Sequence, residues 1–222
     1  MSTDLEHEYI FNWNRLKKVS KLSQKPFDLF DETLRDGIQS PSVTDPTIEQ
    51  KIEILHLMES LGVAEADLGL PGAGKRAVED VTALVKEIAR SKLKIKAAAA
   101  GRTMVRDIQP IADIVQETGV PIEVYAFIGS SPIRLFAEDW DVSTLMGHIE
   151  DSIKFSVNEG LEYCLVTEDT IRSRPEVLDP LFRRAIDLGA TRLCLCDTVG
   201  HATPDGIRNL FDWTHSLLRG AG

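Results

Sequence analysis

Cysteine is scarce in this sequence, with three residues among 222. An odd number of thiols does not make a disulfide framework, so the composition favours a reducing compartment and we expect a cytoplasmic protein. Cys194 and Cys196 are two residues apart and would face the same way on a strand. Core thiols are a commoner interpretation of such a pair than a metal or redox site.

Positive charge is also in deficit. The chain has 25 lysines and arginines against 35 aspartates and glutamates, which gives a formal net charge of -10. Because phosphate contacts need a basic surface, this balance argues against a general nucleic-acid binder or a binder of anionic membranes. It is compatible with a small anionic substrate held by a few local arginines.

Long apolar runs are missing as well. No run approaches the ~20 residues that a membrane-spanning helix needs, and the acidic N-terminus MSTDLEHEYI has no apolar core of a signal peptide. We therefore expect neither a membrane span nor a secretory leader. With 43% hydrophobic and 27% charged residues, the composition is that of a globular protein of one α/β domain, or part of one.

What the sequence does have is a regular alternation of short apolar and longer amphipathic stretches, after a polar lead-in over residues 1–25. The expected strands are 27–30, 64–70, 93–99, 122–128, 163–166 and 192–196, and the expected helices are 44–62, 77–90, 104–119, 142–160, 175–189 and 203–219. Strict alternation predicts a parallel sheet with right-handed crossovers. The two candidates are a doubly wound open sheet and a (β/α)₈ barrel.

The polar residues after the strands favour the barrel. All six expected strands lead into polar residues: 31–39, Asp67, 101–103, 130–134, 167–169 and 197–201. An open sheet concentrates its site near one switch point, whereas a barrel draws on every strand end. A less specific interpretation is that loop residues are polar anyway and that some cap helices. We predict an α/β fold of the TIM-type (β/α)₈ barrel class, incomplete in residues 26–222, with about six β/α units.

Three motifs resemble one family. Residues 31–39, DETLRDGIQ, resemble the D-x-T-L-R-D-G-x-Q signature of the DRE-TIM metallolyase superfamily. Residues 197–204, DTVGHATP, resemble the sixth-strand motif of its isopropylmalate and homocitrate synthase branch, and residues 168–173, EDTIRS, resemble the motif after that branch's fifth strand. The resemblance implies a metal-dependent acyltransferase that condenses acetyl-CoA with a 2-oxo acid.

The resemblance implies roles for three residues after the first strand. Asp36 would bind a divalent metal, for which Mg²⁺, Mn²⁺ and Zn²⁺ are candidates. Arg35 would be catalytic, because a positioned cation stabilises a developing oxyanion. Gln39 would help position the substrate or Arg35.

Further roles follow at the other strand ends. The resemblance implies that Glu168 is catalytic and that Thr198 contacts the 2-oxo acid. Asp67 stands where the family more often has Glu, and Arg102 follows the third strand; both are candidate substrate contacts. Arg134 stands where the synthases often have His, and it would bind a substrate carboxylate or pair with a surface glutamate.

The sequence departs from the family at the metal. The family completes the site with an H-x-H on strand 7, but none of the five histidines, His7, His56, His148, His201 and His215, forms such a pair. We expect a chain that lacks strands 7 and 8, holds metal weakly and has little or no synthase activity. Open sheet edges would favour a homodimer or other self-association.

Three functions stay open. An isopropylmalate synthase-like acyltransferase is the leading prediction. Cys164 and Val166 stand where homocitrate synthases have Arg and Ser, which weakens the homocitrate variant. The alternatives are a lyase of the same superfamily and an inactive barrel fragment with a structural or regulatory role.

Overall fold

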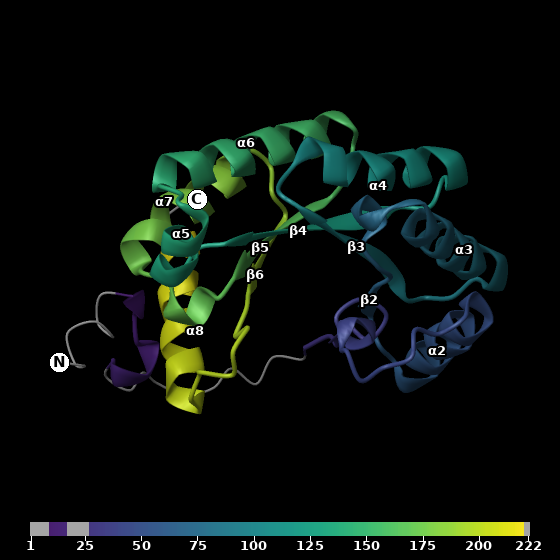
Figure 1. The fold of residues 1–222 in the computed structure, drawn as a ribbon, viewed down its shortest axis with the longest axis horizontal. Coiled ribbons are helices and arrows are strands. Elements are labelled where there is room, and N and C mark those ends of the chain that lie inside the picture. Colours follow the sequence, from purple (N-terminus) through teal and green to yellow (C-terminus); the bar gives the residue numbers. More distant parts are fainter. Residues whose placement is uncertain (1–8, 17–26, 220–222) are drawn as a thin grey trace. The chain divides into compact units, whose positions relative to one another are not determined.

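The computed structural model describes residues 9–16 and 27–219 of the chain. The chain divides into two compact units. Unit 1 contains the described residues 9–16, 127–154 and 164–219, and unit 2 contains 27–126 and 155–163. Each unit is described by itself below, with the labels of Figure 1.

Unit 2 holds the first three strands, which pair in parallel. The strands are β1 (Phe30–Asp31), β2 (Glu65–Asp67) and β3 (Lys96–Arg102), and the helices are α2 (Ile48–Leu61), α3 (Lys75–Ser91) and α4 (Val105–Thr118). Asp31 is in register with Ala66, and Asp67 with Ala98, so β1 and β2 end within one residue of each other, whereas β3 continues to Arg102. The core of this unit is aliphatic, with Leu55, Leu84 and Ile108 fully buried.

Unit 1 holds the last two strands, also parallel, with Thr167 in register with Leu195. Its elements are the 3-10 turn η1 (Trp13–Arg15), α5 (Pro132–Glu138), β5 (Tyr163–Glu168), α7 (Pro175–Asp187), β6 (Arg192–Leu195) and α8 (Pro204–Arg219). The strand β4 (Ile122–Gly129) and the helix α6 (Val142–Asn158) contribute residues to both units. The core of unit 1 is aliphatic with an aromatic cluster, in which Trp213 lies 5.4 Å from Trp13 and 6.2 Å from Phe182 between ring centroids.

The strand order β1-β2-β3-β4-β5-β6 follows the sequence. The prediction of a parallel α/β fold with six strand–helix units is therefore confirmed. Within the described residues, no helix has the length and the apolar character that crossing a membrane requires.

Several predicted boundaries were wrong. The stretch 27–30 was expected to be a buried strand, but Phe27 is 85% exposed, Leu29 is 54% exposed, and β1 comprises only Phe30 and Asp31. The helix expected to start near Thr44 begins at Ile48, because Thr47 caps it: the Thr47 side chain accepts from the Gln50 amide in a reciprocal capping box. The short helix α5 was not predicted at all.

Candidate functional site

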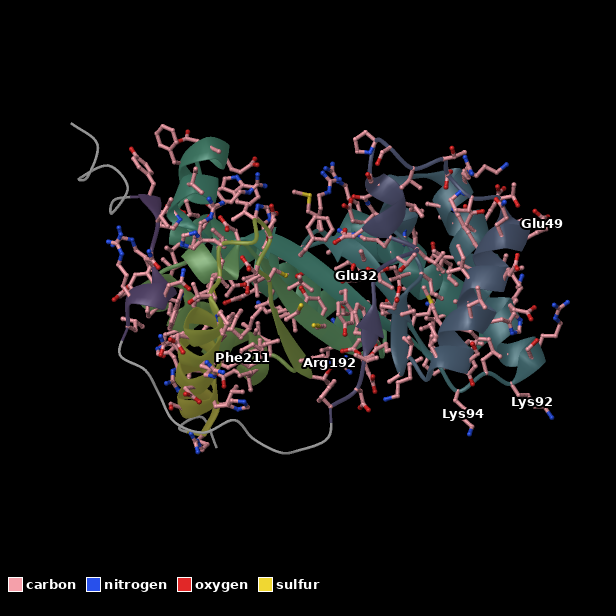
Figure 2. All side chains as sticks on the ribbon, turned by 90° about the horizontal axis from the view of Figure 1, so that it is seen from below. Glu32, Glu49, Lys92, Lys94, Arg192 and Phe211 are labelled. Carbon is pink, nitrogen blue, oxygen red and sulfur yellow. The ribbon has the colours of Figure 1, made fainter. Side chains whose placement is uncertain are left out.

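The segment after β1 brings two predicted site residues together. The Arg35 guanidinium forms an ion pair with the Asp36 carboxylate, and its Nη1 lies 3.9 Å from Glu32 Oε2. Glu32 lies among the other side chains of unit 2, whereas Glu49, Lys92 and Lys94 project outward (Figure 2). Burial and the neighbouring Asp36 charge raise the pKa of Glu32 above its ordinary value. The segment is thus a compact group of one cation and two carboxylates.

Asp67, the last residue of β2, lies within electrostatic reach of this group. Its side chain is 1% exposed, and its Oδ1 accepts a hydrogen bond from the Gly69 amide at 3.0 Å. Burial, with a smaller contribution from the Glu32 charge, raises the pKa of Asp67 to about 7, and Arg35 acts in the opposite direction. The structure therefore couples Asp67 to the β1 segment, although Asp67 and Glu32 are 35 residues apart in the sequence.

A cavity of about 540 Å³ lies beside this cluster within unit 2. Arg35 and Gln39 line it together with the start of α3 and part of α2. Lys51 is buried on its wall and forms ion pairs with Asp80 at 2.7 Å and Asp45 at 3.3 Å. These pairs link the approach to α2 with α3, so a structural role accounts for Lys51.

Arg102, a predicted substrate contact, is engaged elsewhere in unit 2. It forms a two-pronged ion pair with Asp107 of α4, with Nη2 3.0 Å from Oδ1 and Nε on Oδ2. Asp107 also packs against Gly72, where an added Cβ would lie 3.1 Å from the Asp107 backbone. The observed partner of Arg102 is therefore a structural carboxylate, and its contact with a substrate stays a prediction.

In unit 1 the structure brings Arg134 and Glu168 together. Arg134 Nη2 lies 3.1 Å from Glu138 and 3.7 Å from Glu168, which ends β5. The Arg134 side chain also crosses close to Gly129, where an added Cβ would lie 2.8 Å from Nε. A glycine at this position lets the arginine lie flat against β4. The ion pair between Arg134 and Glu138 is therefore present, and Arg134 also lies near Glu168, a predicted catalytic residue.

Sequence reasoning missed the residue that organises unit 1, Asp169. Its carboxylate accepts from the Ser131 hydroxyl at 2.5 Å and from Arg172 at 2.6 and 2.7 Å, and its side chain is almost wholly buried. Its backbone is left-handed, with φ at 61°, a strained conformation for a residue with a Cβ. The signal was available, because Asp169 and Arg172 both belong to the EDTIRS motif.

Thr198 is attached to this network. Its Oγ1 accepts from the Asp169 amide at 2.9 Å, so it fixes the turn after β5. His201, further along the same loop, has a buried Nε2 without a hydrogen-bond partner among the described residues. Cys194 and Cys196 have their sulfur atoms 3.9 Å apart and are only half-buried, so the prediction that they are core thiols was wrong.

The described residues do not complete a metal site. Within 9–16 and 27–219, no group of three or more histidine, cysteine, aspartate or glutamate side chains could hold an ion. Asp36 offers one carboxylate, half-exposed and already paired with Arg35. A single carboxylate binds a divalent ion weakly, because ligand number sets affinity.

Comparison with known proteins assigns the chain to a family. The family model described as HMGL-like matches residues 26–220. The 2-isopropylmalate synthase of Xylella fastidiosa (strain M23) is 30% identical over 205 residues, which are 90% of this chain and 38% of that protein. The homocitrate synthase AksA of Methanopyrus kandleri is 31% identical over 181 residues, 81% of this chain and 43% of that protein. The chain thus spans less than half the length of these relatives.

Solved structures agree on the fold. The HMG-CoA lyase from Brucella melitensis matches with a TM-score of 0.65 and 15% identity, over 86% of this chain and 68% of that one. The fold is that of a TIM-type barrel, present here with six β/α units, and this prediction is confirmed. The resemblance to the DRE-TIM metallolyase superfamily is confirmed too, and the chain belongs to the HMGL-like family.

Proposed function

We propose that this chain is an isopropylmalate synthase-like acyltransferase that condenses acetyl-CoA with a 2-oxo acid. The observation that carries the proposal is the cluster at the carboxyl ends of β1 and β2, where Arg35 pairs with Asp36 and also acts electrostatically on the buried Asp67. The named synthases among the relatives support the acyltransferase class. A divalent metal and acetyl-CoA are the predicted cofactor and co-substrate.

The proposed reaction needs an oxyanion partner. The enolate of acetyl-CoA attacks the keto carbon of the 2-oxo acid, and hydrolysis of the thioester then releases CoA and a 2-alkylmalate-type acid. In this proposal the Arg35 guanidinium donates hydrogen bonds to the oxygen on which negative charge develops. It is a suitable donor because a guanidinium presents several N–H groups in one plane.

The remaining predicted residues would bind the substrate. In unit 2 the predicted substrate contacts are Asp67 and Gln39, and in unit 1 the predicted contact is Thr198. Arg134 would bind a carboxylate of the 2-oxo acid in place of its present partners, Glu138 at 3.1 Å and Glu168 at 3.7 Å. Glu168 would hold neighbouring groups in place. No catalytic step is assigned to a metal, because the described residues do not complete its site.

The test is release of CoA by the full chain with acetyl-CoA, a panel of 2-oxo acids, and saturating Mg²⁺, Mn²⁺ or Zn²⁺. We expect slow release that requires both substrates. Arg35→Lys should lower the rate roughly 10²-fold, the usual effect of losing an oxyanion donor. Arg90→Lys is the matched control, because that side chain is 76% exposed on α3.

Two outcomes would contradict the proposal. Cleavage of a 3-hydroxyacyl-CoA without any condensation would identify a lyase of the same superfamily. Failure to bind either substrate, by calorimetry at millimolar concentration, would favour a structural or regulatory role.

A further inference from the structure

The N-terminal segment 9–16 packs against the loops that carry the unit 1 part of the candidate site. In Figure 1 its purple ribbon lies beside the yellow helix α8. Trp13 anchors it, because this side chain is 1% exposed and packs on Trp213 of α8. The Asn209 side chain of α8 donates to the Trp13 carbonyl oxygen at 2.9 Å. We call residues 9–16 the N-terminal strap.

The strap first contacts the loop after β5. The Phe11 amide donates to the Arg172 carbonyl oxygen at 3.1 Å, and the Trp13 indole Nε1 donates to the Ser173 carbonyl oxygen at 3.2 Å. The side chains of these two loop residues in turn hold Asp169: Arg172 pairs with its carboxylate, and Ser173 Oγ donates to its carbonyl oxygen at 3.0 Å. The strap thus bonds directly to the residues that set the turn beside Glu168.

The strap also contacts the loop after β6, through Asn14. Its Nδ2 donates to the His201 carbonyl oxygen at 3.0 Å, and its Oδ1 accepts from the Thr203 amide at 2.8 Å and the Thr203 hydroxyl at 3.0 Å. One carboxamide therefore makes three hydrogen bonds to a loop that also contains Thr198. The fit is close, because a Cβ added at Gly206 would lie 1.9 Å from Asn14 Oδ1.

We propose that Asn14 is a positioning residue for this site, acting through the 197–203 loop on Thr198. The loop has further hydrogen bonds of its own: the Asp197 carboxylate accepts from the His201 and Ala202 amides, the Gly200 amide donates to the Asp197 carbonyl oxygen, and Thr198 Oγ1 accepts from the Asp169 amide. The Asn14 bonds are the ones that join it to the N-terminal strap. Ordering such a loop costs conformational entropy, and the Asn14 bonds offset that cost. The contribution of Asn14 to substrate binding rests on the proposed function, whereas its ordering of the 197–203 loop does not.

The first test is hydrogen exchange on the folded full chain. Asn14→Ala should accelerate exchange of the His201, Thr203 and Asp169 amides about tenfold, because the three hydrogen bonds from the Asn14 carboxamide to this loop are lost. Asn14→Asp keeps the accepting oxygen and loses the donated bond, so it should restore part of the protection. Exchange at reference amides should not change; one is that of Leu188, the C-cap of α7, which donates to the Arg184 carbonyl oxygen.

A glycine pair supplies a matched control. Gly206→Ala should mimic Asn14→Ala, because the added methyl displaces the carboxamide, and combining the two should add little. Gly147→Ala, also within a helix, meets nothing within 4 Å and should leave all these amides protected. An equal increase in the exchange rate at every amide, reference amides included, would overturn the inference. Unchanged exchange in the 197–203 loop would overturn it too.

The second readout is kinetic. In the CoA-release assay, Asn14→Ala should raise the KM for the 2-oxo acid about tenfold and leave the KM for acetyl-CoA unchanged, because only the Thr198 contact is loosened. Equal effects on both KM values would contradict a positioning role. Absence of activity in the wild-type chain would count against the proposed function, while the exchange result still decides the role of Asn14 in ordering the loop.

Discussion

At the scale of single residues, one carboxylate of the candidate site, Asp67, is fully buried. Asp67 ends a strand whose residues are all buried, so its carboxyl group faces both desolvation and the charge of Glu32. The sequence predicted Asp67 as a site residue, since a polar residue at a strand end is visible in the pattern. It did not predict the raised pKa, because burial depends on neighbours distant along the chain.

The raised pKa of Asp67 predicts a pH-dependent stability. The folded-state pKa of about 7 exceeds the ordinary value of 3.8, so between these values the folded state binds the proton more tightly. The contribution of Asp67 to the free energy of unfolding is fully present below about pH 4. It is lost as pH rises through about 7, by at most about 1.4 kcal/mol per pH unit. Asp67→Asn should abolish this loss, as measured by urea unfolding from pH 4 to 8.

Asp113→Asn is the control, because Asp113 is exposed on α4. Its unfolding free energy should follow the wild type at every pH. Parallel curves for Asp67→Asn and wild type would show that Asp67 is not desolvated as the structure indicates.

At the scale of elements, the alternation of strands and helices was predictable, and the exact ends were not. Hydrophobic periodicity identified six strands and their order, because it reflects which residues must be buried. Periodicity does not show where pairing stops: the apolar stretch 27–30 resembled a buried strand, yet Phe27 and Leu29 are exposed and only two residues of β1 pair with β2. The residue types that can cap a helix are also recognised from local sequence. Both Thr44 and Thr47 are of such a type, so the sequence did not decide between them.

The start of α2 can be tested by comparing these two threonines. Thr47→Ala should lower the free energy of unfolding by about 1 kcal/mol, because it removes the hydrogen bond to the Gln50 amide that closes the capping box. Thr44→Ala should change it by less than about 0.5 kcal/mol, as is usual for an exposed residue. Chemical denaturation measures both. A larger loss for Thr44→Ala would restore the boundary predicted from the sequence.

At the scale of the whole molecule, surfaces suited to association are open. Among the described residues, β1 and β6 are the terminal strands of the order, and an unpaired strand edge invites pairing. A cavity of about 280 Å³ in unit 1 is lined by Leu193 and Leu195 of β6 together with Phe211 and Leu218 of α8. Phe211 is 46% exposed there. An exposed apolar surface of this kind favours contact with another chain.

We therefore predict that the protein self-associates and that Phe211 contributes. Sedimentation over a range of concentrations should show dimers or larger species, and Phe211→Glu should shift the equilibrium about tenfold or more toward monomer, since it places a charge in the apolar surface. Leu57→Glu, at a 56% exposed position of α2, is the control. A concentration-independent, cooperatively melting wild-type monomer would contradict the prediction.

The sequence by itself determined the parallel α/β class, the order of the units and the motifs that belong to the HMGL-like family. These properties depend on periodicity and on residue type at fixed spacing, which are local. Only the tertiary structure decided which charges meet: that Arg102 is held by Asp107, that Arg134 reaches Glu168, and that Asn14 holds the 197–203 loop. Asn14 and Thr203 are 189 residues apart, and such contacts follow from packing, because no local pattern encodes which distant loop a side chain will reach.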